Sequence, residues 1–150
     1  MTYHKPVLLQ QAVAGLVLKP KGVYVDATFG GGGHSTAILE KMDATAKLFG
    51  FDHDSEAAKN SLEDQRFTFL GSNFKNIKAY LQYNKIKMVD GILADLGVSS
   101  HQFDTGHRGF STRIDGPLDM RMNLDQPLDA KTIVNEYSED ELERIFKEYG

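Results

Sequence analysis

The stretch VDATFGGGGHSTAIL, from Val25 to Leu39, decides the fold. Before the glycines, the residues from Gly22 onward are mostly β-branched, aromatic or small, which is typical of a buried strand. After the glycines, the residues from His34 onward place apolar side chains at helical spacing. Four consecutive glycines therefore join a strand to a helix. Because such a run costs backbone entropy, it indicates either a sharp turn or the close approach of a ligand to the backbone.

The same alternation of strand and helix continues along the chain. Strands are predicted at four places: 22–28, 47–52, 66–72 and 88–97. Helices are predicted between them: 34–42, 55–65 and 76–83. Strands that alternate with helices form βαβ units, so the predicted fold class is α/β, with a parallel sheet covered on both faces.

The alternation does not continue through the last third of the chain. Residues 98–128 show neither the period of a strand nor that of a helix. Apolar residues are scattered through this stretch, so we interpret it as a functional loop rather than a disordered one. Helical spacing returns at 130–137 and 138–150, where Ser138 and Glu141 have the spacing of a capping box.

The number of predicted strands bears on whether the chain is complete. Only four can be found, whereas a doubly wound nucleotide-binding sheet usually has six or more. We therefore expect a fragment of a larger protein, and a small four-stranded domain is the alternative. If strands are missing, the fourth strand is an open edge. Open edges favour pairing, which predicts a homodimer through that edge or a long loop folded over it.

Composition limits the function. The formal net charge of -4 gives no overall basic footprint, which argues against a sequence-blind nucleic-acid coat but not against an enzyme that binds RNA locally. The absence of cysteine excludes disulfides and thiolate metal sites, and no histidine and carboxylate spacing indicates a metal. No signal pattern or membrane-spanning run is present, so we expect a cytoplasmic protein without membrane contact.

The glycine run follows the first strand, at the edge of an α/β sheet where ligands bind. The dinucleotide fingerprint fails, because its third glycine position holds Ser35 or Thr36 in the two possible registers. The phosphate-binding P-loop also fails, because it needs a lysine directly after the glycines and none lies between Asp26 and Glu40. Asp26 and Asp52 end the first two strands, and a carboxylate after the second strand suits a ribose diol. This combination favours an adenosine ligand without phosphates, most commonly S-adenosylmethionine; a tight turn without a ligand is the alternative.

The fourth strand ends in Asp95, and Gly97 and the two serines Ser99 and Ser100 come shortly after it. In the predicted sheet this is where a substrate group would meet the cofactor. Asp95 is therefore a candidate functional residue, and the alternatives are a helix cap or a surface charge.

Five segments together resemble the RsmH (MraW) family of bacterial methyltransferases. They are HKPVLLQQAV, VDATFGGGGHS, GFDHD, DGILADLGVSSHQFD and RGFSTRIDGPLDMRMN, and the similarity runs from His4 to the last residue. The resemblance implies methylation of N4 of a cytosine in 16S ribosomal RNA of the small subunit. It also implies a Rossmann-like, class I sheet dependent on S-adenosylmethionine, here incomplete, followed by the start of a helical insertion that helps to bind RNA.

The resemblance also assigns domains and site residues. It implies a cofactor-binding core at 1–100, a long substrate and cofactor loop at 101–128, and a truncated insertion at 129–150. The implied cofactor contacts are Gly32, Gly33, His34, Asp52, Phe74, Asp95 and Gln102. Two features depart from the family: Thr112 replaces a phenylalanine, and family members are about twice as long.

Methyl transfer to an exocyclic amine needs the nitrogen held close to the methyl carbon and acceptors for its hydrogens. Asp95 is the candidate catalytic acceptor, although it could serve the cofactor alone. Asp115, Asp119 and Arg121 are candidates for holding the cytidine or its phosphates. An internal salt-bridge network that stiffens the loop is an equally good interpretation of these three residues.

Two other functions compete with the RNA methyltransferase. A nicotinamide-dependent dehydrogenase already lacks the third fingerprint glycine. A fragment that binds the cofactor but is inactive, because its C-terminal half is missing, is the non-enzymatic alternative. For the loop itself, we expect Gly32→Val to abolish S-adenosylmethionine binding and to leave the fold largely intact.

Overall fold

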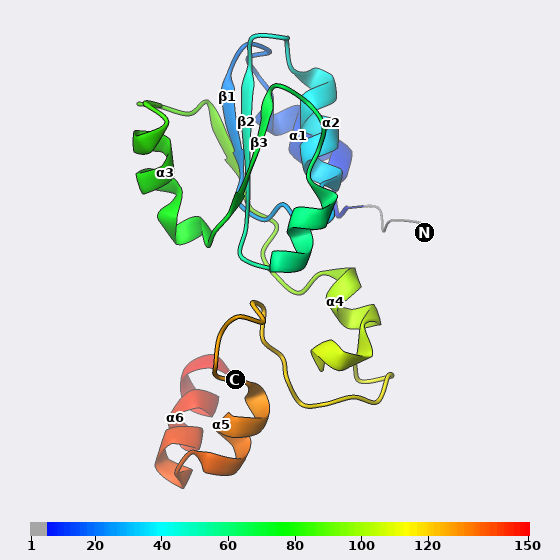
Figure 1. Cartoon of the computed structure of the whole chain (residues 1–150), viewed down its shortest axis with the longest axis vertical. Coiled ribbons are helices and arrows are strands. Elements are labelled where there is room, and N and C mark those ends of the chain that lie inside the picture. The colour runs from blue at the N-terminus through cyan, green and yellow to red at the C-terminus, as the bar shows by residue number, and fades with distance from the viewer. Residues whose placement is uncertain (1–5) are drawn as a thin grey trace. The chain divides into compact units, whose positions relative to one another are not determined.

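The computed structural model describes residues 6–150, and Figure 1 shows the arrangement of its elements. The chain divides into two compact units, Met1–Gly97 and Val98–Gly150, which are described separately. His4, where the family resemblance begins, lies outside the described residues. Within the described part, no helix has both the length and the apolar character needed to cross a membrane.

The first unit contains a parallel sheet of four strands in the order β3-β2-β1-β4 (Figure 1). Its strands are β1 (Val23–Asp26), β2 (Lys47–Asp52), β3 (Phe67–Gly71) and β4 (Gly91–Leu93). Central strand β1 pairs with two neighbours, so that Val25 lies opposite Phe49 on one side and Ile92 on the other. The predicted α/β class and the four predicted strands are confirmed.

Helices cover both faces of this sheet (Figure 1). Helices α1 (Leu9–Leu16) and α2 (Gly33–Lys41) pack on one face, and α3 (Ile77–Tyr83) packs on the other. Successive side chains of a strand point to opposite faces of the sheet, so alternate residues of one strand pack in the two cores. Tyr24 and Leu48 lie in the core with α1 and α2, whereas Val25 lies in the core with α3.

Two elements of this unit differ from the prediction. The helix predicted over 55–65 is only a 3-10 helix, η1 (Ser55–Asn60), because the following residues leave the helical path to reach the glycine loop. Leu62 packs into the core there, with its Cδ2 3.5 Å from the position of a Cβ on Gly32. Helix α1 was not predicted, although its apolar residues have helical spacing.

The second unit consists of short helices and a long loop. Its helices are α4 (Ser100–Asp104), α5 (Ala130–Glu136) and α6 (Glu139–Tyr149), and it also contains the 3-10 turn η3 (Gly106–Arg108). Another 3-10 turn, η2 (Phe74–Asn76), belongs to the first unit. The capping box predicted at Ser138 and Glu141 is present at the start of α6. Helix α4 lies within the stretch that was interpreted as a loop, and a second capping box, between Ser99 and Gln102, begins it.

Candidate cofactor and substrate site

The glycine loop connects the carboxyl end of β1 to the amino end of α2. Gly30 and Gly32 have φ angles of 51° and 76°, in the left-handed region that glycine adopts without strain. Gly32 is the N-cap of α2, so the first N–H groups of the helix point toward the loop. Phe29 supports the loop from below, with its ring stacked on Phe67 at a centroid distance of 5.2 Å. The loop is therefore a built turn with helix N–H donors at its end.

Asp52 ends β2 and fixes the loop. Its Oδ2 accepts a hydrogen bond from the backbone N–H of Gly30 at 2.8 Å, and its Oδ1 accepts one from the N–H of Asp54 at 2.9 Å. The side-chain amide of Asn60 donates to the carbonyl oxygen of Gly30 at 3.1 Å. A carboxylate oxygen has more than one acceptor site. Asp52 can thus hold the loop and still accept hydrogen bonds from a ligand.

Asp26 ends β1 and is fully buried beneath the loop. It accepts hydrogen bonds from the hydroxyl of Ser35 at 2.7 Å and from the N–H of Thr28 at 3.1 Å. Burial raises the pKa of the Asp26 carboxyl, although the hydrogen bond from Ser35 opposes this shift. Asp26 therefore ties the strand, the loop and helix α2 together.

Asp95 lies two residues beyond the end of β4, and its side chain is 51% exposed. Its backbone N–H donates to the hydroxyl of Thr28 at 2.8 Å, which ties this segment to the loop after β1. Oδ2 of Asp95 lies 4.0 Å from Nδ1 of His34. The Asp95 carboxylate is accessible and borders the glycine loop.

A segment near the N-terminus packs on the start of α2, which sequence reasoning missed. The ring nitrogen Nε2 of His34 lies 3.3 Å from the carbonyl oxygen of Val7, and the carbonyl makes this nitrogen the protonated one in neutral histidine. A Cβ on Gly33 would lie 2.5 Å from Cγ of Pro6. Position 33 therefore needs a glycine because Pro6 packs closely against it. The glycine run in the sequence does not predict this contact.

Phe74 begins η2, directly after β3 in the sequence, and it is 42% exposed. Asn73 caps this turn by accepting a hydrogen bond from the N–H of Lys75 at 2.9 Å. Because β3 ends at the same edge of the parallel sheet as β1 and β2, Phe74 lies at the edge that carries the glycine loop.

In the second unit, Gln102 is buried and serves the capping box of α4. Its Oε1 accepts a hydrogen bond from the N–H of Ser99 at 3.0 Å, and its own N–H donates to the Ser99 hydroxyl at 3.2 Å. Its side-chain carbonyl is thus engaged locally in this structure.

Asp119 and Arg121 form the internal ion pair that was one of the two interpretations of these residues. Arg121 Nη2 lies 2.6 Å from Oδ2 of Asp119, and its Nη1 donates to the carbonyl oxygens of Leu124 and Gln126 at 3.1 and 2.7 Å. Hydrogen bonding by Arg121 lowers the pKa of the Asp119 carboxyl. Both side chains therefore stiffen the loop, and buried Arg108 adds to this by donating to the carbonyl oxygen of Arg121 at 3.0 Å.

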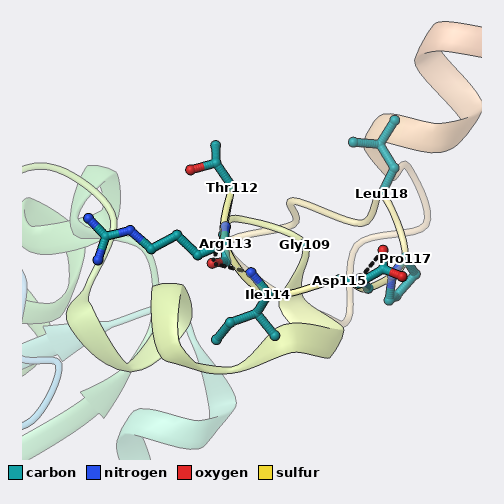
Figure 2. Close-up of a pocket in the computed structure, with 9 residues that line it drawn as sticks. Gly109, Thr112, Arg113, Ile114, Asp115, Pro117 and Leu118 are labelled. Carbon is teal, nitrogen blue, oxygen red and sulfur yellow. Dashed lines mark hydrogen bonds between the residues drawn. The ribbon is translucent and has the colours of Figure 1, made fainter.

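Asp115 differs from that pair because it is exposed and lies in the wall of a pocket (Figure 2). The pocket has a volume of about 370 Å³ and is lined by residues 109 and 111–118. The hydroxyl of Ser111 accepts hydrogen bonds from the N–H groups of Arg113 and Ile114, both at 3.1 Å, which shapes one wall. Thr112, which departs from the family pattern, is exposed on this loop.

Three carboxylates thus follow three adjacent strands of one sheet: Asp26, Asp52 and Asp95. The sequence profile of the MraW methylase family matches residues 1–150, the whole of the chain. This chain belongs to the MraW methylase family. Its place in that family agrees with the parallel sheet and with the absence of a dinucleotide fingerprint in the loop.

Curated members of the MraW family are close in sequence. A protein named ribosomal RNA small subunit methyltransferase H from Flavobacterium johnsoniae is 57% identical over all of this chain and 50% of its own length. The protein of that name from Flavobacterium psychrophilum is 60% identical over 95% of this chain and 49% of its own length. A solved structure from Clostridium thermocellum is 26% identical over 48% of this chain and 45% of its own, with a TM-score of 0.44. The chain spans about half the length of the curated relatives it matches.

Proposed function

We propose that the protein uses S-adenosylmethionine to methylate N4 of a cytidine in 16S ribosomal RNA of the small subunit, in the bacterial cytoplasm. The names of the curated relatives support the small-subunit RNA as substrate. The observation that carries the proposal is the position of Asp52 and Asp95 beside one glycine loop, with Asp26 buried beneath it. A site bordered by carboxylates suits a ligand whose sulfonium and ammonium groups are cationic, and it disfavours a pyrophosphate.

The loop supports a specific division of roles in binding this cofactor. Backbone groups of Gly32, Gly33 and His34 lie at the start of α2. The N–H of Gly32 already donates to the carbonyl oxygen of Phe29 at 2.8 Å, so the N–H groups of Gly33 and His34 are the proposed donors to the carboxylate of a methionine moiety. Asp52 would accept hydrogen bonds from the ribose hydroxyls. Phe74 offers an exposed ring for the adenine. Gln102 is proposed as a further contact.

Asp95 is the proposed catalytic residue. The bound cofactor supplies a methyl group that is electrophilic because it is attached to a sulfonium. The half-exposed carboxylate of Asp95 would accept a hydrogen bond from the amine of the cytosine and draw its proton away, which raises electron density on the attacking nitrogen. Thr28 would fix the position of Asp95, because its hydroxyl accepts a hydrogen bond from the Asp95 backbone N–H.

Substrate contacts are proposed for the long loop. Asp115 has the exposure that a direct contact to the cytidine requires. Asp119 and Arg121 would act together, with their ion pair holding the loop in a shape that the RNA recognises. In this division, residues 1–100 bind the cofactor, 101–128 form the loop, and 129–150 begin a helical insertion.

Calorimetric titration with S-adenosylmethionine tests the cofactor half of the proposal. We expect saturable binding by the unaltered chain. Asp52→Ala should weaken it at least tenfold, because one hydrogen bond to a charged group is worth about 1.5–3 kcal/mol. Asp43→Ala removes a carboxylate just after the C-terminal end of α2, at the opposite end of this helix from the glycine loop, and it should leave the affinity unchanged. No heat of binding and no change in melting temperature with the unaltered chain would contradict the proposal.

A cofactor-binding chain without activity of its own is the second candidate function. The observation that favours it is the length of the curated relatives, which are about twice as long. Methyl incorporation into small ribosomal subunits by the 150-residue chain and by a full-length version separates the two functions. Equal rates would support the enzyme as it stands, and binding without incorporation would support the second candidate.

The open edge of β4 supports a proposed homodimer. Among residues 6–150, this strand pairs with β1 alone, and Ile92 within it is half exposed. An unpaired edge with an apolar side chain favours pairing with a second copy. Light scattering should then give twice the mass of the chain, and a monomer at high concentration would count against the dimer.

A further inference from the structure

The segment from β3 to β4 has a charge pattern unlike that of the rest of the chain. No acidic residue occurs between Asp64 and Asp90. The basic residues in this interval are Arg66, Lys75, Lys78, Lys85 and Lys87. The chain as a whole has more acidic than basic residues, so this interval concentrates positive charge on one part of the molecule.

Arg66 has a structural task, but the four lysines do not. Arg66 pairs with Asp64 at 2.6 Å and donates to two carbonyl oxygens at the end of α2. The four lysines are exposed, and none lies within 4 Å of a carboxylate in residues 6–150. Three lysines outside this segment are paired, namely Lys19 with Asp90 at 2.8 Å, Lys59 with Glu56 at 3.8 Å and Lys147 with Glu143 at 2.6 Å. The positive charge on this segment is therefore not neutralised within the described chain.

The packing of α3 determines which of its sides is available. Ile77, Tyr80 and Leu81 pack against the sheet, and Lys78 lies on the exposed side of the helix. Figure 1 shows α3 on one face of the sheet and α1 and α2 on the opposite face. Tyr83 is 86% exposed at the end of the helix, which places an aromatic ring among the lysines.

The four lysines extend from the carboxyl ends of the strands to their amino ends. Lys75 follows the carboxyl end of β3, and the proposed cofactor site lies at the carboxyl ends of the strands. Lys85 and Lys87 precede the amino end of β4. Helix α3 between them has seven residues, which is a length of about 10 Å. The lysines thus form a track that leads away from the site.

We propose that the α3 track, defined as Lys75, Lys78, Lys85 and Lys87, binds phosphates of the RNA that flanks the methylated cytidine. This proposal rests on the proposed function. Unpaired lysines, side-chain amides and an exposed tyrosine ring are the groups that contact an RNA backbone and its bases. Phosphates repeat along RNA, and the four lysines are distributed before, within and after α3, so one RNA strand can contact several of them.

The α3 track is better suited to this task than the helices at the end of the chain. In residues 129–150, acidic residues outnumber basic ones and would repel phosphates. The acidic residues are Asp129, Glu136, Glu139, Asp140, Glu141, Glu143 and Glu148, and the basic residues are Lys131, Arg144 and Lys147. RNA phosphates could contact this stretch favourably only near its few basic residues.

The test replaces all four lysines of the α3 track by glutamine. A matched control replaces Lys21, Lys41, Lys47 and Lys59, which are also exposed, and changes the net charge by the same amount. Binding to small ribosomal subunits and to an unstructured RNA oligonucleotide is measured over a range of salt concentrations. Each lost phosphate contact lowers the slope of log K against log salt by about 0.7 for single strands, so four contacts lower it by about 3.

We expect the α3 variant to bind both RNAs at least tenfold more weakly and with the shallower slope, and the control to keep the slope of the unaltered chain. Replacement of the same four lysines by arginine should restore binding, because the charge is retained. Equal losses in variant and control, or salt-independent RNA binding, would overturn the proposal. Binding of the track to phosphatidylserine vesicles without binding of RNA would also overturn it.

S-adenosylmethionine affinity distinguishes this proposal from the proposed function. The α3 variant should bind the cofactor as the unaltered chain does, because no lysine of the track contacts the glycine loop. If the unaltered chain binds RNA through the track but binds no S-adenosylmethionine, the methyltransferase proposal fails and the RNA surface stands.

Discussion

Single residues of the glycine loop have structural tasks that explain their presence independently of a ligand. Asp26 and Asp52 could be recognised in the sequence as strand-ending carboxylates, because strand periodicity and the glycines fix their positions. Their partners could not be recognised, since Gly30 is 22 residues from Asp52, and the contact of Pro6 with Gly33 joins residues of different elements. Local patterns contain no information on such distant contacts.

The structure adds a cost in stability to the prediction that Gly32→Val abolishes cofactor binding and leaves the fold largely intact. Gly32 has a φ of +76°, and a Cβ there would lie 3.0 Å from Cζ of Phe29. A β-branched residue in this region is strained by about 1–3 kcal/mol. Urea denaturation should show a clear loss of stability. Gly71→Ala is the control, because its nearest neighbour would be an ordinary 3.7 Å away.

Asp26→Asn tests the buried carboxylate. Burial raises the pKa of Asp26 in the folded protein. The contribution of Asp26 to folding is therefore complete below its ordinary pKa of 3.8 and is lost as the pH rises through the raised value. Asparagine stays neutral at every pH. The stability of the Asp26→Asn variant relative to that of the unaltered chain should therefore increase between pH 3.5 and pH 8.

Urea midpoints measured across this range check the sign. A difference between Asp26→Asn and the unaltered chain that does not change with pH would show that the carboxyl is not perturbed. Asp43→Asn, which alters a partly exposed carboxyl near the end of α2, should show no such increase.

At the scale of elements, the sequence predicted most strands and helices because each has a clear period. The exceptions have tertiary causes. Element η1 ends at Asn60 because the side chain of Asn60 donates to the carbonyl of Gly30, and that contact bends the chain away from a helix. Helix α4 has only five residues, too few to establish a period, and its capping box was the available signal. Helix α1 had a helical period that was passed over.

The connection between α2 and β3 depends on one ion pair. Arg66 donates to carbonyl oxygens at the end of α2, and Asp64 holds its guanidinium from the other side. Hydrogen bonding to Arg66 lowers the pKa of Asp64 to about 2. Because the folded pKa is depressed, this stabilisation is present above the ordinary value of 3.8 and is lost as the pH falls toward 2.

Asp64→Asn should therefore lower the melting temperature at pH 7, and the difference from the unaltered chain should shrink as the pH falls from 4 to 2. Thermal unfolding followed by circular dichroism at several pH values measures this. Glu63→Gln is the matched control, because Glu63 is exposed and adjacent. A deficit that persists at pH 2 would contradict the assignment.

At the scale of the molecule, the whole sheet lies within the first unit, Met1–Gly97, together with the apolar residues that cover its two faces. We therefore expect a protein ending at Gly97 to fold. Its thermal transition should be cooperative, and its spectrum should retain the strand signal. A gradual transition without a cooperative step would show that the sheet needs residues 98–150.

The strand order β3-β2-β1-β4 has a consequence for the nascent chain. After β1 is made, its first neighbour β2 follows within about twenty residues, but its other neighbour β4 is made only near residue 93. Synthesis proceeds at about 5–20 residues per second, so one side of the central strand stays unpaired for several seconds on the ribosome. During that interval the growing polypeptide exposes hydrogen-bonding groups that a chaperone can protect.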